Sequence, residues 1–168
     1  AGADFVEGWT GGPLVVRHVV GARGWSAGEM ATAVPSEVEY RAVEYEHDLP
    51  TLLAAADLVL CRSGATSIAE ITVLGVPSVL VPLPGAPGDH QTVNARNLVE
   101  AGGALLLPDD ELDGPALAEL LGPLLADPER LRTMAAAARA AGRPDAADRL
   151  ADLIAHHAAP RREDGPDA

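Results

Sequence analysis

The segment from Cys61 to Glu70 contains residues whose types and spacing suit the binding of a phosphorylated ligand. An apolar run, Leu58 to Leu60, precedes it, and an amphipathic run, Ile68 to Leu74, overlaps its end. This order predicts a buried parallel strand, a tight turn through Ser63-Gly64, and the first turn of a helix. Backbone N–H groups at a helix start have no partners inside the helix and lie at its positive end, so they suit a diphosphate.

Two further groups of polar residues follow. Glu70 lies about one helical turn further along, where a carboxylate could accept two hydrogen bonds from the vicinal hydroxyls of a ribose. A second buried strand, 78–81, leads through a proline-rich exit to His90-Gln91 and Asn94, which open another helix. Because both loops leave the carboxyl ends of parallel strands, where open α/β sheets bind ligands, they are predicted to share one site.

The same residues also have purely structural interpretations. The turn could simply join a strand to a helix, with Thr66 or Ser67 as the helix cap. The charged and amide side chains could equally serve the fold, by pairing with surface groups or by holding a loop; these are Arg62, Glu70, His90, Gln91 and Asn94. The residues by themselves leave both interpretations open.

Composition excludes several classes of function. The chain has 168 residues, enough for one domain with a substantial core, and its net charge of −13 argues against nucleic-acid binding and against adhesion to anionic lipid. Cys61 is the single cysteine, so no internal disulfide can form. The sequence shows no zinc-ligand spacing, nucleophile elbow or Walker loop, and its apolar runs are too short to span a membrane. No secretory signal pattern opens it.

The elements that must position these residues alternate along the chain. Strands are predicted at 14–21, 38–45, 58–61, 78–81 and 104–107, and helices at 49–56, 65–74, 91–101, 114–125, 128–141 and 145–157. Strands separated by helices predict right-handed βαβ units, and therefore an α/β fold with a Rossmann-like parallel sheet flanked by helices.

The two ends of the chain lack a clear pattern. No element is predicted over Ala1 to Gly12, and neither the first strand nor the glycine-rich loop of a Rossmann-like half is visible before Leu14. We therefore expect the sequence to begin inside a longer protein, with one domain over residues 1–159. The alternative is a divergent first element. Residues 160–168 are charged and contain Gly and Pro, which predicts a disordered tail.

The combined motifs closely resemble the MurG family. The matching residues are Arg62-Ser63-Gly64-Ala65 through Glu70, together with His90-Gln91 and Asn94-Ala95. Enzymes of this family add N-acetylglucosamine to the lipid-linked muramyl-pentapeptide of peptidoglycan synthesis. The resemblance covers roughly residues 14–125 and is to the C-terminal half of these enzymes, which implies the C-terminal half of a GT-B glycosyltransferase.

The resemblance assigns a role to each matched position. It places the backbone from Ser63 to Thr66 against the donor diphosphate, Glu70 against the uridine ribose, and His90-Gln91 against the hydroxyls of N-acetylglucosamine. Tyr45-Glu46 would contact the uracil ring. The implied substrate-binding set is Tyr45, Glu46, Arg62, Ser63, Gly64, Ala65, Thr66, Ser67, Glu70, His90, Gln91 and Asn94.

The implied activity is inverting transfer from UDP-N-acetylglucosamine at the cytoplasmic face of the cell membrane, without a metal or other cofactor. The acceptor site, the membrane-docking surface and the catalytic base would lie in the N-terminal half, so this chain alone is expected to be inactive. Two alternatives remain open. One is another two-domain sugar-nucleotide enzyme, such as a natural-product glycosyltransferase or an epimerase. The other is a non-catalytic donor-binding subunit that needs a partner chain.

Overall fold

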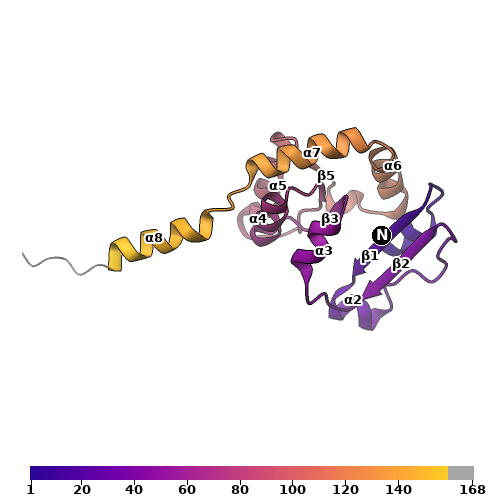
Figure 1. Cartoon of the computed structure of the whole chain (residues 1–168). Coiled ribbons are helices and arrows are strands. Elements are labelled where there is room, and N and C mark those ends of the chain that lie inside the picture. Colours follow the sequence, from indigo (N-terminus) through magenta and orange to yellow (C-terminus); the bar gives the residue numbers. More distant parts are fainter. Residues whose placement is uncertain (159–168) are drawn as a thin grey trace, which may run out of the picture.

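The computed structural model describes residues 1–158 and has an α/β architecture (Figure 1). Within this range, five short strands alternate with helices. They are β1 (Leu14–Val19), β2 (Val38–Val43), β3 (Val59–Cys61), β4 (Ser78–Leu80) and β5 (Ala104–Leu106). All strand pairs in the described part are parallel, which confirms the predicted fold class.

The strands form two sheets in the described residues. β1 pairs with β2, with Leu14 opposite Val38, and the other sheet has the order β3-β4-β5, with Val59 opposite Ser78. This division was not predicted from the sequence. One edge of β1 and one edge of β3 therefore have no hydrogen-bonded strand beside them within residues 1–158.

Helices cover the strands and lie between them in the chain. They are α1 (Gly2–Glu7), α2 (Gly21–Ala27), α3 (Leu49–Ala55), α4 (Ala65–Leu74), α5 (His90–Glu100), α6 (Gly114–Leu125), α7 (Pro128–Ala141) and α8 (Ala146–Ala158), with short 3₁₀ helices η1 (Pro87–Asp89) and η2 (Asp109–Glu111). The helices predicted at 65–74, 114–125 and 128–141 have the observed bounds, and the other predicted elements differ by one or two residues at one or both ends.

The central strand β4 separates two clusters of buried side chains. Val79 packs with side chains of α1, α6 and α7, whereas Leu80 packs with side chains of α4, α5 and α7. Both residues are fully buried. Successive residues of a strand point to opposite faces, so this strand is covered on both sides and holds the turn after β3 against a rigid support.

The structure corrects two predictions about the start of the chain. Residues 2–7 form helix α1, although no element was predicted over Ala1 to Gly12, because Phe5 and Val6 are buried against α6. The apolar run that begins at Leu14 was predicted to be a buried strand, yet its residues alternate between partly buried and exposed, and Val15 is 69% exposed.

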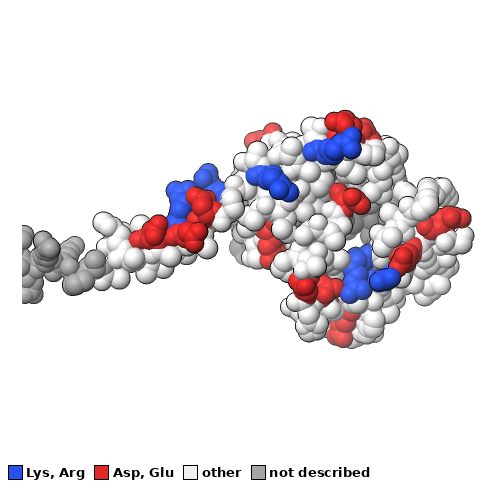
Figure 2. Space-filling view, in the orientation of Figure 1, with Lys and Arg blue, Asp and Glu red and all other residues white. Residues whose placement is uncertain are grey.

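The surface and the last helix complete the description. α8 extends away from the other elements, and all its residues are exposed (Figure 1). Acidic and basic side chains are interspersed over the visible face rather than gathered in one acidic field (Figure 2). None of the helices in the described range has the length and apolar character needed to cross a bilayer. The tail predicted at 160–168 lies outside the described residues.

Candidate functional site

The turn after β3 presents free backbone donors at the start of α4. Gly64 is the N-cap residue of α4 in an extended conformation, and no side chain accepts a hydrogen bond from the first turn of the helix. The alternative that Thr66 or Ser67 caps α4 is therefore not observed. Space is open around Gly64, because a Cβ placed there would meet no atom within 4 Å. The N–H groups of Ala65, Thr66 and Ser67 are consequently available to an anionic ligand.

Ser63 and Asn94 lock this turn to the start of α5. The hydroxyl of Ser63 is fully buried and donates to the carbonyl oxygen of Gln91 over 2.9 Å. The carboxamide nitrogen of Asn94 donates in return to the carbonyl oxygen of Ser63 over 3.2 Å. The two segments predicted to form one site are thus joined by two hydrogen bonds across about thirty residues of sequence. The structure brings Ser63, Gln91 and Asn94 together.

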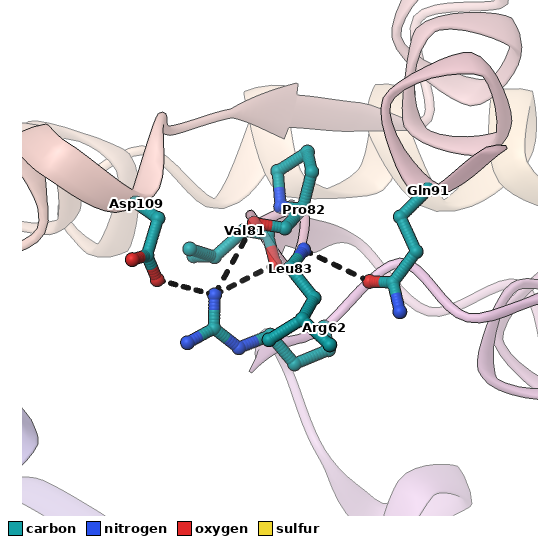
Figure 3. Close-up of polar contacts among 6 residues, drawn as sticks. All are labelled: Arg62, Val81, Pro82, Leu83, Gln91 and Asp109. Carbon is teal, nitrogen blue, oxygen red and sulfur yellow. Dashed lines mark hydrogen bonds and ion pairs between the residues drawn. The ribbon is translucent and has the colours of Figure 1, made fainter. Parts of the chain in front are cut away.

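Arg62 holds the strand ends around the turn (Figure 3). Its Nη1 atom donates to the carbonyl oxygens of Val81 and Pro82 over 3.4 and 3.3 Å, and it forms an ion pair with Asp109 at 2.5 Å. Three strand ends, those of β3, β4 and β5, therefore meet at one guanidinium group. The structural alternative for Arg62, pairing with a carboxylate, is the arrangement that the structure shows.

Gln91 completes a closed series of contacts. Its Oε1 atom accepts a hydrogen bond of 3.0 Å from the backbone N–H of Leu83, two residues after the carbonyl of Val81 that Arg62 holds (Figure 3). Since Ser63 follows Arg62 and bonds the backbone of Gln91, the series returns to its start. We call this set the contact ring; its members are Arg62, Ser63, Val81, Pro82, Leu83 and Gln91.

Glu70 carries a carboxylate near the same strand end. The hydrogen bonds that fix the turn run through Arg62, Ser63 and Asn94, and none of them uses Glu70. Burial raises the pKa of the Cys61 thiol to about 11, and the negative charge of Glu70 adds to this rise. The carboxylate of Glu70 is partly exposed and able to accept hydrogen bonds. The thiol itself stays protonated and unreactive at neutral pH.

His90 is exposed at the first position of α5. Its Nδ1 atom lies 2.7 Å from the carbonyl oxygen of Pro87. A carbonyl can only accept, so Nδ1 carries a proton in this contact. Asp89, just before it, has a positive φ of 50° and anchors the hydroxyl of Thr92. The local backbone therefore points His90 to the surface beside Gln91.

Tyr45 and Glu46 lie after β2, in the smaller sheet. The ring of Tyr45 is 69% exposed and meets the ring of His47 edge-on, with centroids 5.0 Å apart. Glu46 accepts from Arg17 over 2.7 Å and from the backbone N–H of Asp48 over 3.2 Å. The bond from Arg17 lowers the pKa of Glu46. No hydrogen bond or ion pair in residues 1–158 joins this segment to the contact ring, so a shared site stays a prediction.

Sequence reasoning missed Arg17 and Asp109. Nothing in the sequence pairs Arg17 with Glu46. A signal for Asp109 did exist, because it is the second residue after Leu107 and therefore leaves a buried strand at the same edge as Ser63.

A shallow groove of about 260 Å³ lies between α4 and α5, behind the turn. Ala65 and Asn94 reach it, but its remaining lining is mostly apolar: Ile68, Ala69, Thr72, Asn97, Leu98 and Ala141. Neither Arg62 nor Glu70 lines this groove, so it overlaps the predicted site only at Ala65 and Asn94. Within the described range, no group of three His, Cys, Asp or Glu side chains is arranged to hold a metal ion.

Comparison with known proteins identifies many relatives. The chain is 55% identical over 107 residues to a protein of Rhodospirillum rubrum, 51% over 110 residues to one of Desulforudis audaxviator, and 44% over 149 residues to one of Acidothermus cellulolyticus. These alignments cover 64, 66 and 88% of this chain, but only 28, 30 and 40% of the respective relatives. All three are UDP-N-acetylglucosamine–N-acetylmuramyl-(pentapeptide) pyrophosphoryl-undecaprenol N-acetylglucosamine transferases.

Solved structures agree with these matches. Acinetobacter baumannii MurG superposes with a TM-score of 0.83 at 29% identity, over 92% of this chain and 44% of that protein. The glycosyltransferase VinC, at 20% identity and a TM-score of 0.65, shares the fold. The predicted resemblance to MurG is thereby confirmed. Residues 6–150 match the family described as the glycosyltransferase family 28 C-terminal domain. The chain therefore belongs to glycosyltransferase family 28 and contains its C-terminal domain.

Proposed function

We propose that this chain is the donor-binding half of an inverting hexosyltransferase that adds N-acetylglucosamine to a lipid-linked muramyl-pentapeptide. The observation that carries the proposal is the turn from Ser63 to Thr66 at the carboxyl edge of the sheet. The N–H groups at the start of α4 are free, while the hydroxyl and carbonyl of Ser63 are bonded to Gln91 and Asn94. Relatives that share 44–55% identity with the chain carry this activity in their names.

In the proposed mechanism, the turn and the positive end of α4 bind the diphosphate of UDP-N-acetylglucosamine. Negative charge grows on this diphosphate as the bond to the anomeric carbon breaks, and fixed backbone dipoles stabilise that charge without reorganising. Glu70 accepts hydrogen bonds from the ribose hydroxyls, and Tyr45-Glu46 contact the uracil. Gln91 and His90 contact the sugar, and an acceptor hydroxyl attacks the anomeric carbon from the opposite side.

The rest of the reaction belongs to the part of the relatives that this chain does not span. We place the acceptor site, the base that deprotonates the acceptor hydroxyl and the membrane-docking surface there. The complete enzyme would then act at the cytoplasmic face of the cell membrane, in peptidoglycan synthesis and so in cell shape and division. No cofactor enters this scheme, and no nucleic acid is a partner, in keeping with a net charge of −13.

Nucleotide selectivity tests the proposal. Titration of the ¹⁵N-labelled chain with UDP, ADP and thymidine diphosphate should give the tightest binding for UDP, with amide shifts centred on residues 62–70 and 90–94. VinC was crystallised with dTDP, so tighter binding of thymidine diphosphate would favour the natural-product class of glycosyltransferase. Equal affinities for UDP and ADP would contradict a uridine site.

A further inference from the structure

The guanidinium group of Arg62 faces the strand ends and not only the turn. All three of its contacts use Nη1, which points at the carbonyl oxygens of Val81 and Pro82 and at Asp109 (Figure 3). The Asp109 carboxylate neutralises the positive charge that a diphosphate would otherwise meet. A residue placed for direct phosphate binding would instead keep its charge unpaired.

We propose that Arg62 is a positioning residue that fixes the side chain of Gln91 through the contact ring, and that Asp109 holds Arg62 in this role. The inference rests on the proposed function, in which Gln91 contacts the sugar of the donor. It gives Arg62, a member of the implied substrate-binding set, an indirect role in binding the donor.

The contact ring links the side chains of Arg62 and Gln91 through a short stretch of backbone, residues 81–83. Arg62 holds the carbonyl oxygens of Val81 and Pro82, and the next residue, Leu83, donates its N–H to Oε1 of Gln91. That bond identifies the oxygen of the carboxamide, because an N–H group needs an acceptor. The nitrogen of Gln91 therefore points away from Leu83 (Figure 3). Gln91 consequently offers N–H donors to a ligand, which suits the hydroxyl or acetamide oxygens of a sugar.

A direct role and an indirect role of Arg62 predict different patterns of loss. If Arg62 bound the diphosphate directly, it would contribute equally to the binding of UDP and of UDP-N-acetylglucosamine. Removal of Asp109 would then free the charge of Arg62 and strengthen the binding of both nucleotides. A positioning residue would contribute mainly to the sugar-bearing nucleotide, and removal of Asp109 would weaken the binding of that nucleotide. Lysine cannot replace Arg62 in the indirect role, because its side chain is one atom shorter and does not bring a nitrogen to the position of Nη1.

Calorimetric titration of the chain with both nucleotides separates these cases. We expect Arg62→Lys and Asp109→Ala each to weaken the binding of UDP-N-acetylglucosamine by about three- to tenfold, the equivalent of one hydrogen bond. The affinity for UDP should change by less than about twofold. Arg132→Lys is the matched control, because Arg132 pairs with Glu129 on an exposed face of α7. Equal losses for both nucleotides, or a lower melting temperature with unchanged affinities, would overturn the proposal.

A measurement without nucleotide tests the contact ring independently of the donor. Hydrogen exchange of the Leu83 amide should be faster in Arg62→Lys and in Asp109→Ala than in wild type, and unchanged in Arg132→Lys. Unchanged exchange in the first two variants would refute the link to Gln91. If the wild-type chain bound neither nucleotide, the proposed function would fail and the sugar role with it, whereas faster Leu83 exchange would still support the hold on Gln91.

Discussion

Replacement of Glu70 is the sharpest test of the ribose contact. The Glu70 carboxylate takes no part in the bonds that fix the turn, and it lies close enough to the end of β3 to raise the pKa of Cys61. A carboxylate with free lone pairs can accept from both ribose hydroxyls. Hydrogen bonds to a charged group contribute about 1.5–3 kcal/mol, so Glu70→Gln should weaken UDP binding by about 1–3 kcal/mol, or about 5- to 150-fold.

The assay is a thermodynamic cycle, in which the affinities of wild type and Glu70→Gln are measured for UDP and for 2′-deoxyuridine diphosphate. Wild type should bind 2′-deoxyuridine diphosphate less tightly than UDP, and Glu70→Gln should bind the two almost equally, because the partner of the 2′-hydroxyl is already weakened. Unfolding free energy should change by less than about 0.5 kcal/mol, since no contact of the fold is removed. Glu119→Gln, an exposed acid on α6, is the control. Unchanged UDP affinity in folded Glu70→Gln would refute the reasoning.

Three further predictions concern stability and activity. Leu117 is fully buried, so Leu117→Ala should lower the unfolding free energy measured in urea by about 2–5 kcal/mol. The control Leu153→Ala, on exposed α8, should have little effect, and equal effects of the two substitutions would contradict the assigned core. Burial lowers the pKa of His18, so its stabilising contribution is complete above about pH 6.5 and declines as the pH falls through that value. The loss of unfolding free energy in urea from about pH 7 to about pH 5 should therefore be smaller in His18→Gln than in wild type. An equal loss in both proteins would contradict this role of His18. We also expect the chain alone to form no disaccharide from UDP-N-acetylglucosamine and a lipid-linked acceptor, because positioning of the acceptor and a base are both required; sustained turnover lost in His90→Ala would show a complete enzyme instead.

The sequence predicted the helices that have strong local signals. α6 and α7 begin at Asp-Gly-Pro and Asp-Pro, where Asp113 and Asp127 accept from the first turn, and α4 ends at Gly75 in the left-handed conformation. These caps act within a few residues, so they are visible without a structure.

The missing parts depend on contacts between distant residues. α1 has only six residues and little intrinsic preference for a helix, and it forms because Phe5 and Val6 pack against α6, more than 100 positions later. The candidate site shows the same limit. Its turn and its amide residues were predictable, whereas the ion pair of Arg62 with Asp109 spans 47 positions and became evident only in three dimensions.

The unpaired edge of β1 has a consequence for isotope exchange. Leu14 and Val20 donate their N–H groups to Glu37 and Val43 beside β2, so the alternate amides of residues 15, 17 and 19 face the other edge, where no described strand lies. In deuterated water, neighbouring amides of one strand should therefore exchange at rates that alternate between slow and fast. Addition of polypeptide that pairs with this edge would slow the fast amides, so their decay times report directly on whether the sheet has been extended.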